Sequence, residues 1–229
     1  MQVIGIVAEY NPFHTGHAYQ IARTRQALEE GCAVVAVMSG NWVQGGRPAV
    51  LDKWTRARLA LLGGVDLVLE LPTVWAVSSA ESFARGAVTI LERSGVVDVL
   101  SFGSEYGDVE KLRRLAACLN TPEYEERLRR FVGEGMPFAA ARQAAADSLL
   151  GEELSLLLSQ PNNNLGVEYL RTLDSLNSKI RPMTVRREGA PHDSLLEGAD
   201  RPRHLSATQL RAYLERGDWP AVIRRNPNR

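Results

Sequence analysis

Short runs of branched apolar residues alternate with helical patterns along the first hundred residues, and this alternation limits the fold more than any other feature of the sequence. The runs cover residues 3–7, 33–38, 66–71 and 96–102, and the first two contain no polar residue. Short runs of this kind are typical of strands that are buried on both faces of a parallel sheet. Because helical patterns separate them, right-handed β-α-β crossovers are expected. The sequence therefore predicts an α/β protein with a parallel sheet.

The intervening segments carry the periodicity and the end signals of helices. Helices are predicted over residues 15–30, 52–62 and 79–93, the second with Asp52 as its N-cap and Gly63 as its stop. In the first helix, one apolar face is formed by Ala18, Ile21, Ala22 and Leu28. Strand, turn and helix thus repeat as a unit along this part of the chain.

The alternation stops after Gly107, and this change divides the chain. Residues 108–178 carry only helical patterns, punctuated by Thr121-Pro122 and Gln160-Pro161. Strand character returns over residues 180–186, and the capping-box pattern Ser206-Ala207-Thr208-Gln209 opens a last helix. We expect an α/β core over 1–107, a helical insertion over 108–178, and a return strand and helix over 179–229.

Charge and composition exclude several classes of protein. The chain has 27 basic and 27 acidic residues, yet residues 181–229 hold ten arginines against six acids, which suits an anionic ligand. No apolar run approaches the roughly 20 residues that cross a bilayer, and no secretory signal opens the chain. We expect a cytoplasmic protein without a membrane partner. Cys32 and Cys118 are too few for a zinc site, and no metal held by protein side chains is expected.

The turn after the first strand is the richest candidate site. His14 and His17 lie three residues apart at a helix start, and Gly16 between them leaves the backbone accessible. The amides and the dipole of a helix N-terminus favour an anion, and the imidazoles add donors and potential positive charge, so phosphate is the expected ligand. A metal site and ordinary helix-start histidines are the alternatives. Lys53 and Arg56 on the second helix could reach phosphate or RNA, or lie on a solvated face.

Two motifs and several further blocks carry a family resemblance. The segment from Asn11 to His17 resembles the HxGH signature of the nucleotidyltransferase superfamily, and the segment from Leu205 to Arg211 resembles its second signature. Blocks over nearly the whole chain resemble the tRNA(Met) cytidine acetate ligase family, among them Met38-Ser39-Gly40-Asn41, Phe102-Gly103-Ser104-Glu105 and Pro161-Asn162-Asn163-Asn164. The resemblance implies a Rossmann-like nucleotidyltransferase fold with a parallel sheet and a helical insertion.

The resemblance also implies an activity. Enzymes of this family use ATP to convert acetate to acetyl-adenylate and transfer the acetyl group to N4 of the wobble cytidine of elongator tRNA(Met). Acetate, ATP and this tRNA are therefore the expected substrates, and Mg²⁺ is expected with ATP. Acetate itself attacks the α-phosphorus, so no side-chain nucleophile and no general base is assigned. A small-molecule nucleotidyltransferase with a different acceptor is the alternative, and a non-catalytic ATP or RNA binder is a third.

Site residues follow from the matching positions. His14, His17 and Arg211 are the expected catalytic residues, of which the histidines contact the phosphates. The expected ATP-binding residues are Val7, Ala8, Glu9, Tyr10, Asn11, Pro12, Phe13, His14, Thr15, Gly16, His17, Ala18, Tyr19, Gln20, Gly103, Asn162, Arg187, Ser206 and Thr208. Gly103 is placed on the turn after the fourth strand, Asn162 could equally be a helix N-cap, and Arg186 is the alternative to Arg187.

Two departures from the family pattern accompany the resemblance. Gln44-Gly45-Gly46-Arg47-Pro48 stands where relatives usually read Gln-Arg-Gly-Glu-Pro. Family chains also extend beyond the second signature into a helical region that helps hold tRNA, whereas this sequence ends at Arg229. The chain is then either a piece of a longer protein or a short homologue that keeps adenylation and uses another acceptor.

Overall fold

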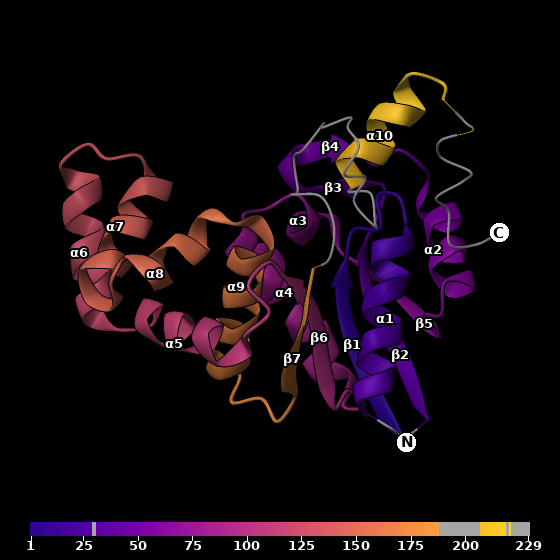
Figure 1. Ribbon diagram of the computed structural model, residues 1–229, viewed down its shortest axis with the longest axis horizontal. Coiled ribbons are helices and arrows are strands. Elements are labelled where there is room, and N and C mark those ends of the chain that lie inside the picture. Colours follow the sequence, from indigo (N-terminus) through magenta and orange to yellow (C-terminus); the bar gives the residue numbers. More distant parts are fainter. Residues whose placement is uncertain (29–30, 188–206, 219, 221–229) are drawn as a thin grey trace.

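A five-stranded parallel sheet forms the centre of the computed structural model, which describes residues 1–28, 31–187, 207–218 and 220 (Figure 1). The strand order is β5-β2-β1-β6-β7. The strands are β1 (Gln2–Ala8), β2 (Cys32–Ser39), β5 (Leu67–Leu71), β6 (Val99–Ser104) and β7 (Arg181–Arg186). The predicted α/β fold with a parallel sheet is confirmed.

Strand β6 is displaced toward the C-terminus from the predicted range of 96–102. Val96 is exposed, and the carboxylate of Asp98 accepts a hydrogen bond from the amide of Val3 at 2.8 Å. The strand then continues through Ser104 because each residue up to that position pairs with β7.

Both faces of the sheet are covered, as the apolar strands require. On β2, Val34, Ala36 and Met38 pack toward the face covered by α1 (Thr15–Leu28) and α2 (Lys53–Leu62). Val35 and Val37 pack toward the opposite face, which α4 (Ala80–Ser94) covers. This alternation follows from the two-residue period of a strand.

The predicted helices form, with one correction to the face of α1. Asp52 caps α2 by accepting hydrogen bonds from the amides of Trp54 and Thr55. In α1, however, Ala22 is exposed, whereas Thr24 is fully buried. The Thr24 hydroxyl lies 2.7 Å from that of Ser101 on β6, so the buried face of α1 includes a polar pair that the predicted apolar face did not contain.

Short elements connect the main ones. A two-stranded hairpin of β3 (Trp42–Val43) and β4 (Arg47–Pro48) encloses the 3₁₀ helix η1 (Gln44–Gly46), where Gly45 and Gly46 both have positive φ. Helix α3 (Thr73–Ala76) follows β5, and α10 (Ala207–Glu215) comes after β7 in the chain. None of the helices in the described residues is long and apolar enough to cross a membrane.

Between β6 and β7 the chain is helical, and most of these helices lie to one side of the sheet (Figure 1). They are α5 (Val109–Leu119), α6 (Pro122–Gly133), α7 (Phe138–Leu150), α8 (Glu152–Ser155), the 3₁₀ helix η2 (Leu156–Ser159) and α9 (Pro161–Ser175). Thr121 caps α6 ahead of Pro122, as predicted. Helix α9 packs against α4 and α5 and so joins these helices to the sheet.

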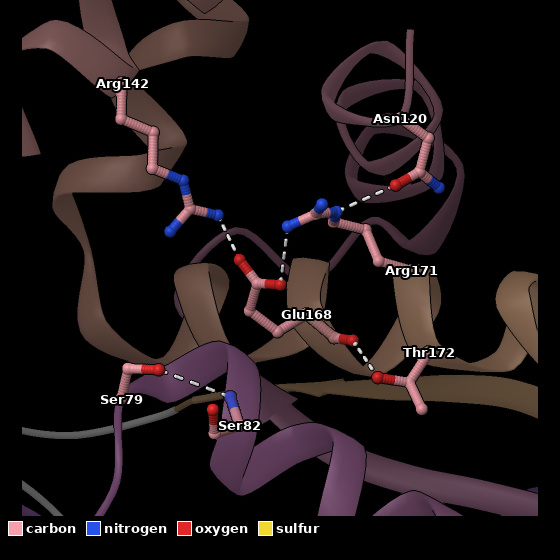
Figure 2. A network of polar contacts seen from close by, with 7 residues as sticks. All are labelled: Ser79, Ser82, Asn120, Arg142, Glu168, Arg171 and Thr172. Carbon is pink, nitrogen blue, oxygen red and sulfur yellow. Dashed lines mark hydrogen bonds and ion pairs between the residues drawn. The ribbon is translucent and has the colours of Figure 1, made fainter. Parts of the chain in front are cut away.

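A buried ion-pair network fixes α9 to its neighbours (Figure 2). The Glu168 carboxylate, with the residue 1% exposed, binds Arg142 of α7 and, at 2.9 Å, Arg171 one turn along α9. Arg171 also donates to the side chain of Asn120 at the end of α5. Two arginines thus satisfy the oxygens of a carboxylate that burial would otherwise destabilise.

Candidate active site

The paired histidines lie where the strand order of the sheet changes direction. From β1 the chain continues to β2 and β5 on one side, whereas β6 and β7 lie on the other. Helix α1 begins beyond the carboxyl end of β1, and its Gln20 donates a hydrogen bond of 3.1 Å to the carbonyl of Ser101 on β6. Ligands of open parallel sheets bind at this kind of reversal.

The histidine side chains are held by backbone amides of the same turn. The amide of His14 donates to Nδ1 of His17 at 3.2 Å, and the amide of Gly16 donates to Nδ1 of His14 at 3.0 Å. The two ring centroids are 3.8 Å apart. A ring whose Nδ1 accepts carries its hydrogen on Nε2, so each imidazole presents an Nε2–H donor. The two histidines lie on one face, as predicted. The amides of His14 and Gly16, however, donate to the imidazoles, whereas amides of this turn were expected to bind the anion.

Charge at His17 is fixed by its surroundings. Burial lowers the pKa of His17 well below its ordinary value of 6.5, and the neighbouring His14 and Arg187 lower it further. Tyr10 and Phe13 contact the His17 ring with centroid distances of 4.9 and 5.4 Å. The potential positive charge expected at this position is therefore absent near neutral pH, and His17 is a neutral hydrogen-bond donor.

This lowered pKa predicts a pH-dependent stability difference. Below about pH 6.5 the unfolded chain protonates His17 and the folded chain does not, so the free energy of unfolding falls as the pH drops. The slope due to this group is at most about 1.4 kcal/mol per pH unit. Urea unfolding of the parent chain and of His17→Gln at pH 7.5, 6.5 and 5.5 measures it. The stability difference between the two proteins should change below pH 6.5, and a constant difference would contradict the assignment.

Gly103, Gln20 and Arg187 converge beside the histidines. Gly103 lies within β6 and not on the turn after it, contrary to the prediction. A Cβ built on Gly103 would lie 3.5 Å from Cγ of Arg187 and 3.8 Å from Oε1 of Gln20. The glycine thus keeps space open between these side chains. Of the two candidate arginines, Arg187 faces this space, whereas Arg186 packs over Gly107.

Asn162 joins the same group, although it is not the N-cap of its helix. It is the second residue of α9, and its Oδ1 lies 3.5 Å from Nη1 of Arg187. The acceptor at this helix start is the side chain of Glu105, which binds the amides of Asn162 and Asn163. Sequence reasoning missed this role of Glu105. The available signal was its place directly after a strand, in a block that resembles the ligase family.

The described part of the late motif contacts the first turn. Arg211 of α10 donates to the carbonyl of Asn11 at 3.0 Å and to the hydroxyl of Thr208 at 2.9 Å. Residues 200 positions apart therefore share one edge of the sheet. Ser206 lies outside the described residues.

The rest of the segment from Val7 to Gln20 forms the wall of the site. Val7 and Ala8 end β1, and the Glu9 carboxylate accepts a hydrogen bond from the amide of Gln44 at 2.9 Å. The buried side chains of this stretch are Tyr10, Asn11, Pro12 and Phe13, and Asn11 Oδ1 accepts from the amide of Val50 at 2.8 Å. Thr15, Ala18 and Tyr19 are half-buried in the first turns of α1.

The side chain of Arg56 does not lie where either prediction placed it. It is neither solvated nor directed at a ligand, because it is fully buried and donates to four backbone carbonyls, those of Glu9, Ser39, Gly40 and Leu51. Lys53 is half-buried and pairs with Glu70 at 2.7 Å. Arg56 therefore ties the ends of β1 and β2 to α2.

The metal alternative for the histidine pair would need further ligands close to the two rings. Within the described ranges, no group of three or more His, Cys, Asp or Glu side chains is placed to hold a metal ion. Phosphate, bound by imidazole and guanidinium donors, is a ligand that suits this set of side chains.

The sheet order, together with the histidine pair at the first strand-to-helix turn, defines a Rossmann-like nucleotidyltransferase fold. The chain belongs to the HIGH nucleotidyl transferase family, whose model matches residues 1–227.

Two curated relatives indicate which members of that family the chain resembles. A tRNA(Met) cytidine acetate ligase of Caldanaerobacter subterraneus is 46% identical over 226 residues, which are 97% of this chain and 55% of that protein. One from Clostridium botulinum (strain Langeland) is 43% identical over 94% of this chain and 54% of its own. The chain thus spans about half the length of the curated relatives it matches.

Solved structures agree with the fold. The crystal structure of Thermotoga maritima TmcAL without ligand matches with a TM-score of 0.91 at 41% identity, covering 99% of this chain and 54% of that one. The same protein bound with alpha-thio ATP matches with a TM-score of 0.87 at 41% identity, covering 99% of this chain and 53% of that one.

Proposed function

We propose that this chain activates acetate with ATP and supplies the acetyl group for N4 of the wobble cytidine of elongator tRNA(Met). The observation that carries the proposal is the convergence of His14, His17, Arg187 and Arg211 at the strand-order reversal. The names of the relatives, all tRNA(Met) cytidine acetate ligases, support the choice of substrates.

In this proposal ATP lies along the segment from Val7 to Gln20. The Nε2–H groups of His14 and His17 donate to phosphate oxygens, and Arg211 and Thr208 approach the outer phosphates. Gly103 and Asn162 line the opposite side of the nucleotide together with Arg187. The relative bound with alpha-thio ATP supports the choice of nucleotide.

The first step joins acetate to AMP. A carboxylate oxygen of acetate attacks the α-phosphorus of ATP, the bond to the bridging oxygen breaks, and pyrophosphate leaves. Negative charge accumulates on the phosphate oxygens in the transition state, where fixed donors stabilise it most. His17 suits this task because it is neutral, half-buried and aligned by the His14 amide. Alignment of the two substrates supplies the rest of the acceleration.

The second step transfers the acetyl group to RNA. The N4 amine of cytidine attacks the carbonyl carbon of acetyl-adenylate, the anhydride bond breaks, and AMP leaves as the amine loses a proton.

The proposed reaction needs tRNA, acetate and ATP together, so we place the protein in the cytoplasm. Mg²⁺ is expected to accompany ATP through phosphate oxygens and water, because the described residues form no three-ligand cluster of their own.

The two steps are tested separately. Incorporation of labelled pyrophosphate into ATP should require acetate and no tRNA, and its absence at saturating acetate and magnesium would overturn the proposal. Incubation with ATP, labelled acetate and total tRNA, followed by nucleoside analysis, should yield N4-acetylcytidine. Exchange that requires a phosphorylated metabolite in place of acetate would instead favour a small-molecule nucleotidyltransferase.

Removal of the Arg211 guanidinium is expected to raise the KM for ATP in the exchange reaction about 10- to 100-fold, the range of a lost charge-assisted hydrogen bond. Arg211→Ala tests this, and Arg216→Ala is the matched control, because Arg216 is an exposed arginine just beyond α10. Equal KM values for the two variants would contradict the role given to Arg211.

A further inference from the structure

Glu105 holds one end of the proposed ATP site by three hydrogen bonds. Its Oε1 accepts from the backbone amide of Asn162 at 3.2 Å and from the side-chain amide of the same residue at 2.6 Å. Its Oε2 accepts from the amide of Asn163 at 2.8 Å. A carboxylate matches this arrangement because all three partners are donors and both of its oxygens only accept.

The contact with Asn162 decides which way that side chain points. Since its NH₂ group is held by Glu105, its oxygen is directed to the other side, where it lies 3.5 Å from Nη1 of Arg187. The backbone of Arg187 is fixed separately, because its amide donates to the carbonyl of Ser104 at 2.9 Å. Glu105 therefore acts on the guanidinium through Asn162.

The loop that carries Glu105 is fixed to α9 in the reverse direction as well. Oδ1 of the fully buried Asn163 accepts a hydrogen bond from the amide of Tyr106 at 3.1 Å. Reciprocal bonds between neighbouring residues on the two segments leave the carboxylate little freedom.

We infer that Glu105 is a positioning residue of the proposed ATP site, which orients Asn162 and, through it, the Arg187 guanidinium toward the phosphates. The inference rests on the proposed function, since it assigns Arg187 to the nucleotide. A neutral glutamine cannot replace the carboxylate, because its NH₂ group would face one of the three donors.

Replacing Glu105 with a neutral residue has two opposite effects on ATP binding. Removing a negative charge near an anion site should strengthen ATP binding, whereas loss of the Asn162 and Arg187 orientation should weaken it. For Glu105→Gln we expect the dissociation constant of ATP, measured by calorimetry without acetate or tRNA, to rise about tenfold. Glu110→Gln removes the same charge from the exposed first turn of α5 and should leave ATP binding unchanged.

A double-mutant cycle separates positioning from a general loss of structure. Asn162→Ala should also weaken ATP binding, and adding Glu105→Gln to it should weaken binding no further than about twofold, because the two residues act in series. Multiplied effects would mean that Glu105 acts only by capping α9. If Glu105→Gln does not fold, Glu105→Asp keeps the charge but shortens the side chain, and ATP binding should weaken at least about threefold.

The outcomes distinguish this inference from the proposed function. Unchanged or tighter ATP binding by Glu105→Gln overturns the inference alone. The expected binding pattern without any acetylation supports the inference and overturns the acetate chemistry. If the parent chain does not bind ATP at all, both are overturned.

Discussion

Replacing His17 with alanine is expected to lower the maximal rate of acetate-dependent ATP–pyrophosphate exchange about 100- to 1,000-fold. This is the usual cost of removing one preorganised donor from a site where negative charge develops. The His17 ring meets that description, since the His14 amide fixes its Nδ1 and the Tyr10 and Phe13 rings pack against it. Its lowered pKa keeps it a neutral donor near neutral pH.

Measurement at saturating ATP and acetate isolates the chemical step from binding. Gln26→Ala is the control, because Gln26 is an exposed residue near the other end of α1 and should leave the rate unchanged. A loss of less than about threefold for His17→Ala would show that its donor is not used in the transition state.

Replacing Arg56 with methionine is expected to lower the free energy of unfolding by about 3–5 kcal/mol. Methionine fills much of the same volume, but it leaves four carbonyl oxygens without the donors they now have. The contacts to Ser39 and Gly40 are buried and those to Glu9 and Leu51 are partly buried. Each buried unsatisfied group costs about 1–3 kcal/mol before relaxation offsets part of it. Three of these carbonyls, those of Glu9, Ser39 and Gly40, lie at or just beyond the carboxyl ends of β1 and β2. Loosening them should also weaken ATP binding.

Urea unfolding checks this prediction, with Arg58→Met as the matched control. Arg58 is two residues along the same helix and exposed, so its replacement should change the free energy of unfolding by no more than about 0.5 kcal/mol. Similar small values for both variants would show that Arg56 is not the structural tie that its contacts describe.

Helix ends were predicted well because their signals are local. Asp52 and Thr121 each accept a hydrogen bond from an amide two or three residues ahead, so both partners of the cap lie within four consecutive residues. The histidine pair was predicted for the same reason, since residues three apart share a helix face. Thr24 was not, because the Ser101 hydroxyl that makes its burial acceptable lies 77 residues away.

The sequence by itself determined the parallel α/β fold, the choice of the turn after the first strand as the candidate site, and the family resemblance, because strand periodicity, caps and motifs each lie within a short segment. Only the tertiary structure decided which cations face the site. Neighbouring residues at the end of a strand point to opposite sides, so Arg187 and Arg186 are equivalent in sequence until the packing of β7 against β6 separates them. Likewise, Arg56 has the sequence environment of a surface residue, and the carbonyls that bury it are assembled only when β1, β2 and α2 meet.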